Sequence, residues 1–236
     1  MTLFLDEPAA DATPAEAVAE PPASPLPPRI PAPAERLLER ADALAAGPRP
    51  VAAVAAYREL LAADPGHVEG RLHLARLLVA LEEPDGALSL LGQALREAPD
   101  QTEYLVLRGG ILARMRLYEA AEADLRRVLR LYPSHAPAHM ELGQMLWRKG
   151  LAVEAAGHFR RSLEIQPDQS AAYHYLGDAL NQAGDLPGAR TALERAVQLD
   201  SRNAKAHHLL GRVLDRLGYP EEAREMYCRA RDLAGA

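Results

Sequence analysis

The side chains most able to do chemistry in this sequence are its eight histidines and its single cysteine. His135 and His139 are four residues apart, a spacing at which two metal ligands share one face of a helix. Pro137 lies between them, and no carboxylate or thiolate converges on the pair in the sequence. Cys228 has no histidine close to it in sequence, so we interpret it as an ordinary reduced thiol. The pattern therefore predicts no metal and no cofactor.

Sequence motifs of the common enzyme classes are also absent. The chain contains no G-x-x-x-x-G-K-[ST], G-x-S-x-G or H-E-x-x-H. The net charge of -6, from 27 Lys and Arg against 33 Asp and Glu, gives no general attraction for nucleic acid. Two arginine pairs, Arg126-Arg127 and Arg160-Arg161, are interleaved with acidic residues, which is typical of a solvated helix surface. We predict a protein that is not an enzyme and does not bind nucleic acid.

The composition favours a helical fold. Hydrophobic residues make up 48% of the chain but aromatic residues only 5%, so Leu, Ala and Val must fill the core. A single cysteine excludes an intramolecular disulfide framework. No apolar run approaches the roughly 18 residues of a membrane span, so we expect no direct membrane insertion.

The first 33 residues differ from the rest of the chain. They hold nine of its 19 prolines, five acidic residues and one basic residue. Proline fixes φ and removes a backbone donor, so neither a helix nor a sheet is expected to run through this segment. We predict a disordered or polyproline-like Pro/Ala-rich arm over residues 1–33. No basic residue precedes the short apolar stretch at residues 3–5, unlike in a secretory signal, which indicates a cytoplasmic protein.

From Ala34 onward a pattern recurs every 34 residues without insertion. Position 8 of each unit is Ala or Gly, position 11 is Leu, position 20 is Ala, and position 24 is large and apolar. The spacing predicts two helices per unit, whose small residues at positions 8 and 20 let the backbones approach while the residue at position 24 fills the remaining space. Gly150, Gly184 and Gly218 are predicted to end first helices. The units are residues 34–67, 68–101, 102–135, 136–169, 170–203 and 204–236.

This pattern resembles the tetratricopeptide repeat family over about residues 34–236. The fifth unit is the closest match, with Leu176-Gly177, Gly184, Ala189 and Ala196 in place. The resemblance implies an all-α fold, a right-handed α-solenoid superhelix of antiparallel helix pairs. It also implies that the first helices line a concave groove and that the array binds proteins.

In this family, positions 2, 5, 9, 12 and 13 of each first helix project into the groove. The resemblance places the only tryptophan, Trp147, among these positions beside Arg148, and both residue types are enriched at interface hot spots. The alternative is that Trp147 packs against the next repeat as core. The groove positions lack the residues with which some family members hold a carboxylate tail. The candidate partner-binding residues are Leu72, Arg76, Val106, Arg114, Met140, Gln144, Trp147, Arg148, His174, Asp178, Asn181 and Arg212.

The two ends of the chain suggest self-association. Position 28 is aliphatic in five units and becomes Arg231 in the sixth, which we interpret as a polar end cap. Leu214, Met226 and Leu233 nevertheless leave an apolar edge at the C-terminal repeat that would support dimers. Residues 1–7 contain Leu3-Phe4-Leu5-Asp6-Glu7, whose apolar and acidic side chains complement the groove. Docking of this segment would give autoinhibition or self-assembly.

Two functions fit these patterns. The first is a protein–protein interaction adaptor or scaffold that binds a partner peptide in the concave groove. The alternative is an accessory or assembly subunit of an enzyme or membrane-associated complex, self-assembling through its N-terminal arm. The sequence does not identify the partner.

Overall fold

The computed structural model describes residues 33–235, and the prediction of an arm over residues 1–33 lies almost wholly outside them. Within the described residues the chain forms twelve helices and no strand, which confirms the all-α prediction. The helices are α1 (Pro33–Ala45), α2 (Pro50–Ala63), α3 (Val68–Ala80), α4 (Pro84–Glu97), α5 (Thr102–Arg114), α6 (Tyr118–Leu131), α7 (Ala136–Arg148), α8 (Ala152–Ile165), α9 (Ser170–Ala183), α10 (Leu186–Leu199), α11 (Ala204–Leu217) and α12 (Pro220–Ala234).

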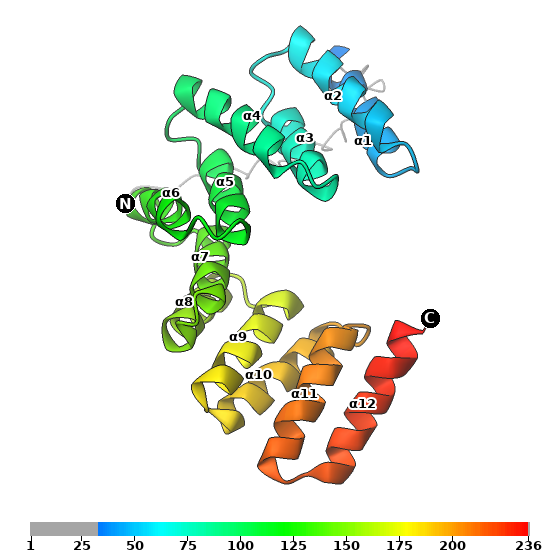
Figure 1. Cartoon of the computed structure of the whole chain (residues 1–236), viewed down its shortest axis with the longest axis vertical. Helices are drawn as coiled ribbons and strands as arrows, with labels where there is room; N and C mark the ends of the chain where they lie inside the picture. The colour runs from blue at the N-terminus through cyan, green and yellow to red at the C-terminus, as the bar shows by residue number, and fades with distance from the viewer. Residues whose placement is uncertain (1–32, 236) are drawn as a thin grey trace, which may run out of the picture.

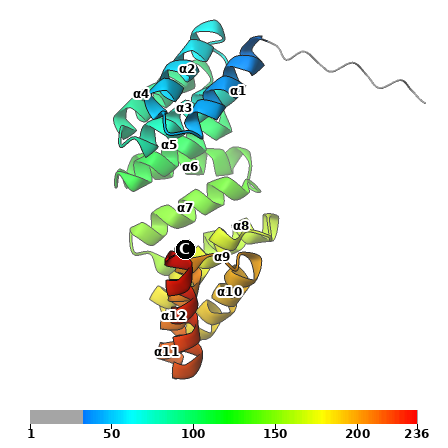
Figure 2. The same ribbon diagram turned by 90° about the vertical axis from the view of Figure 1, so that its right-hand side faces the viewer.

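The helices form antiparallel pairs that stack into a curved array, with α1 at one end and α12 at the other (Figures 1 and 2). Each first helix packs against the first helix of the next pair. The described second helices do not pack on one another in this way, although the side chain of Arg190 in α10 reaches that of Glu222 in α12 at 3.0 Å. Because the first helices lie closer together, the array curves toward them. The odd-numbered helices therefore line its concave surface, and the predicted right-handed α-solenoid is confirmed.

Close packing of a small residue against a large one joins the two helices of each pair. A methyl group added at Gly177 in α9 would lie 2.5 Å from Cγ of Leu193 in α10, and one at Gly143 would lie 2.7 Å from the ring of Phe159. Leu193 and Phe159 are fully buried. The predicted size alternation between positions 8 and 24 is confirmed.

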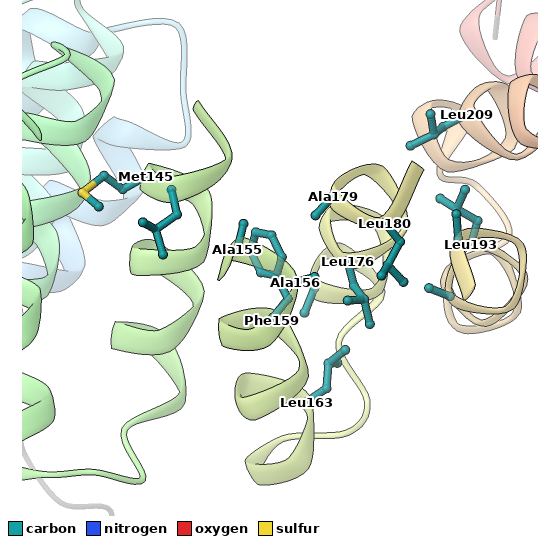
Figure 3. Packing of buried hydrophobic residues seen from close by; sticks show 14 of the residues in the cluster. Met145, Ala155, Ala156, Phe159, Leu163, Leu176, Ala179, Leu180, Leu193 and Leu209 are labelled. Carbon is teal, nitrogen blue, oxygen red and sulfur yellow. The ribbon is translucent and has the colours of Figure 1, made fainter. Parts of the chain in front are cut away.

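Successive pairs share a second apolar seam. Figure 3 shows Ala156 and Leu163 of α8 pointing toward Leu176 of α9, so the second helix of one repeat packs on the first helix of the next. These three residues belong to one buried cluster that runs from α5 to α12. The array is thus held by contacts between sequence neighbours.

The turn inside each pair keeps one backbone shape in five repeats. Gly150, Gly184 and Gly218 follow their first helices with φ of 84°, 88° and 84°, as predicted for helix-ending glycines. Glu82 and Arg116 occupy the same register in the second and third repeats with φ of 63°. Non-glycine residues are disfavoured there, so the packing of the helix pair imposes the turn on these two sequences.

Polar residues at the apolar position 4 bond to the turn between repeats. His139 Nε2 lies 3.0 Å from the carbonyl oxygen of Pro133, and His207 Nε2 lies 3.1 Å from that of Ser201. Arg71 likewise donates to the carbonyl oxygen six residues earlier. These side chains therefore supply hydrogen bonds to carbonyl groups in the turns between repeats. They replace the apolar side chain that position 4 usually contributes to the core.

We expect Gly177→Ala to destabilise the protein and Gly157→Ala to stabilise it. The new methyl group at position 177 must displace Leu193 at a cost of about 1–3 kcal/mol, more than the gain in helix propensity. Gly157 lies inside α8 with no atom within 4 Å of an added Cβ, so its replacement should gain about 0.5–1 kcal/mol. Urea unfolding monitored by circular dichroism measures the free energy of unfolding of both variants. Equal changes in the two variants would contradict the close-packing argument.

Candidate interaction surface

All twelve candidate binding residues lie on first helices, which line the concave side of the array. They differ in how much of each side chain remains accessible. Three arginines are exposed: Arg76, Arg114 and Arg212. Seven residues are partly buried: Val106, Met140, Gln144, Trp147, Arg148, His174 and Asp178. Leu72 and Asn181 are buried.

The two buried candidates already have partners within the fold. Leu72 is part of the core cluster of the first repeats. Asn181 accepts hydrogen bonds from Nη1 of Arg216 at both its backbone carbonyl, at 3.0 Å, and its side-chain oxygen. This contact joins α9 to α11, so a partner reaches the Asn181 side chain only by displacing Arg216.

Trp147 combines packing with an unused donor. Its ring lies edge-on to Tyr175 of the next repeat, with centroids 6.1 Å apart, so the core-packing interpretation holds for the ring itself. Its Nε1 atom is buried and has no hydrogen-bond partner within the described residues, and the same is true of Nη1 of Arg148. Buried donors without acceptors are uncommon in folded proteins, because each one loses its hydration without compensation.

A carboxyl group that the sequence analysis missed lies near Arg148. Burial raises the pKa of Glu141 in α7, and the nearby Arg148 and Arg114 partly offset this effect. The carboxylate occupies the space over Gly110, where an added Cβ would lie 2.6 Å from Oε2. Glu141 is at position 6, outside the groove positions considered. The sequence feature that could have revealed this contact is the acid at position 6 of the fourth repeat together with the glycine at position 9 of the third.

The histidines with metal-ligand spacing serve local structure. Nδ1 of His135 accepts a hydrogen bond of 3.1 Å from the backbone N–H of Ala138 and caps α7. Nδ1 of His139 lies 3.0 Å from Nδ1 of His158 in α8. Because Nε2 of neutral His139 donates to the Pro133 carbonyl, its Nδ1 must accept and Nδ1 of His158 must donate. Across residues 33–235 no three His, Cys, Asp or Glu side chains gather as a metal site requires.

The fold and this surface define a helical repeat array with a concave interaction face. Profiles described as "Tetratricopeptide repeat" match residues 43–109, 111–170 and 204–235, and one described as "TPR repeat" matches residues 177–218. The chain belongs to the tetratricopeptide repeat family. None of its described helices is long and apolar enough to cross a bilayer.

Solved structures share this fold at low sequence identity. PilW, described as a widely conserved type IV pilus biogenesis factor, is 23% identical with a TM-score of 0.72, covering 82% of this chain and 90% of its own. PilF of Pseudomonas aeruginosa is 20% identical with a TM-score of 0.71, covering 85% and 91%. YrrB, described as a TPR protein with an unusual peptide-binding site, is 20% identical with a TM-score of 0.56, covering 75% and 91%. No curated protein matches the sequence.

We expect the stability of the protein to fall as the pH drops below about 6.5, the ordinary pKa of histidine. Burial, His139 and Arg126 lower the pKa of His158, and burial also lowers that of His174. The unfolded chain then binds protons more readily than the folded one, so acidification favours unfolding. Between pH 7.5 and 5 the midpoint of thermal unfolding should fall less steeply with decreasing pH for His158→Gln than for wild type. An unchanged dependence on pH in His158→Gln would contradict this assignment.

We expect Glu141→Gln to raise the unfolding midpoint by a few degrees at pH 7. A carboxyl whose pKa burial raises destabilises the folded state once ionised, and glutamine keeps its size without the charge. The gain should shrink as the pH falls through the carboxyl range toward 4, because protonation of Glu141 removes the charge that burial disfavours. Differential scanning calorimetry at both pH values tests this, with exposed Glu225→Gln as the control. A loss of stability at pH 7 would show that the carboxylate is a favourable partner of the two arginines.

Proposed function

We propose that this chain is a non-enzymatic, cytoplasmic adaptor or scaffold that binds an extended or helical peptide of a partner protein on its concave surface. In this proposal residues 34–236 are the binding domain and residues 1–33 a separate arm. The observation that carries it is the pair of unpartnered donors on Trp147 and Arg148, in the fourth of six repeats. A bound peptide would supply the acceptors that these two groups lack.

The surroundings of this donor pair support a polypeptide ligand. Glu141 offers an acceptor to main-chain N–H groups, while Trp147 Nε1 and Arg148 Nη1 offer donors to carbonyl or carboxylate oxygens. A peptide main chain presents both kinds of group along its length. The exposed Arg76 and Arg212 make no ion pair within residues 33–235, which leaves them available for acidic side chains of a partner. Arg114, also exposed, already interacts electrostatically with Glu141. The further proposed contacts are Leu72, Val106, Met140, Gln144, His174, Asp178 and Asn181.

A second candidate function is an accessory or assembly subunit of an enzyme or membrane-associated complex. The observation that favours it is the similarity in fold to PilW, which is described as a pilus biogenesis factor. The two functions differ in what binds. An adaptor recovers several proteins that carry related peptides, whereas a subunit recovers one partner in fixed stoichiometry.

Affinity purification with mass spectrometry, comparing wild type with Trp147→Ala plus Arg148→Ala, tests the proposed site. We expect recovery of the partner to fall at least about tenfold, as for hot-spot residues, while helicity by circular dichroism stays unchanged. The control is Tyr219→Ala plus Arg190→Ala, an aromatic–arginine pair 5.1 Å apart that involves the second helix α10. Full partner recovery by the first variant would move the site to the convex face or the ends of the array.

A further inference from the structure

A pocket of about 480 Å³ opens where the last helix pair meets the concave surface. Residues from α9, α11 and α12 line it, so it combines the inner side of the array with a face of its last helix. Its floor contains Leu209 and Ala230, which are 5% and 7% exposed. We call it the C-terminal pocket; its lining residues are His174, Asp178, Ala204, Lys205, His208, Leu209, Arg212, Tyr227, Ala230, Arg231 and Ala234.

The preceding repeat shows how the corresponding face of a second helix is covered elsewhere in the array. Leu193 and Ala196 in α10 hold the register of Tyr227 and Ala230 in α12, and both are fully buried because α10 packs on α9 and on α11. No described element packs in that way on α12. At position 28 the side chain of Arg231 is 78% exposed. The C-terminal pocket is therefore an apolar floor with a charged rim, and the ligand that fits it carries both apolar and charged groups.

The charge of the rim is positive. Lys205, Arg212 and Arg231 face the pocket with one acid, Asp178. Among the described residues Lys205 and Arg212 make no ion pair, and Arg231 makes one only with its exposed neighbour Asp232, at 3.8 Å. Such a pair contributes little in water, so all three cations remain available. This local excess of positive charge stands out in a chain with a net charge of -6.

We propose that the C-terminal pocket binds residues 3–7 of this same protein. This segment reads Leu3-Phe4-Leu5-Asp6-Glu7 and lies outside the described residues. Its three apolar side chains match the floor formed by Leu209, Tyr227 and Ala230, and its two carboxylates match the cationic rim. The first 33 residues carry five acids and one base, so their charge adds to the attraction.

The segment reaches a pocket in one of two ways. Residues 8–32 span at most roughly 90 Å when fully extended, which sets the reach to the pocket of the same chain. Binding to the pocket of a second copy is a heterologous contact, which joins copies head to tail. The site and its ligand are the same in both cases. This inference does not depend on Trp147 or Arg148, although the pocket shares His174, Asp178 and Arg212 with the proposed partner surface.

Photo-crosslinking in the full-length chain tests this proposal, with Phe4 replaced by p-benzoyl-phenylalanine. We expect crosslinks to concentrate on residues 204–234. The yield should fall at least about fivefold in Arg212→Glu plus Arg231→Glu and equally in Asp6→Lys plus Glu7→Lys, and should recover when all four changes are combined. Arg224→Glu plus Arg229→Glu makes the same charge change on α12 outside the pocket and should leave the yield unchanged.

The remaining outcomes separate support from contradiction. Crosslinks within one chain at all protein concentrations support the proposal. Crosslinks between chains also support it if the average mass measured by light scattering rises with protein concentration. Crosslinks that concentrate near Leu72, Val106 and Met140, no preferred position, or no recovery in the fourfold variant overturn it. Circular dichroism of each variant checks that the array is folded. Partner recovery by the chain with Asp6→Lys plus Glu7→Lys shows separately whether the adaptor function persists.

Discussion

The close approach of two helices across a small residue is the interaction on which this structure depends. At Gly177 and Gly143 there is no room for a Cβ, because Leu193 and Phe159 of the second helix fill that space. Repeating this contact at a constant spacing gives helix pairs of one shape. Similar pairs stack in succession, and contacts between neighbouring first helices bring these helices to the concave side.

That geometry divides polar side chains into those used by the fold and those left for a partner. Arg108 forms two hydrogen bonds, of 2.6 and 2.7 Å, to the buried Asp124, and so belongs to the fold. Trp147 and Arg148 keep buried donors without acceptors. A fold tolerates such groups where a ligand satisfies them, which is why they carry the functional proposal.

Much of the fold was predictable because it depends on contacts between residues close in sequence. The helix pairs, the glycine-ended turns at Gly184 and Gly218 and the small-to-large packing follow from periodicity within one unit of 34 residues. The candidate surface was predictable only as a set of register positions. Whether a side chain at such a position stays accessible depends on the neighbouring repeat.

The sequence by itself therefore determined the repeat and its helices, because local spacing dictates which side chains share a helix face. The concave side of the array came from the resemblance to the repeat family. Only the tertiary structure decided the state of particular side chains. The bond from Arg216 to Asn181 joins residues 35 positions apart, and the carboxylate of Glu141 lies over Gly110 of another repeat. These contacts arise when helices pack, and no spacing within a single repeat encodes them.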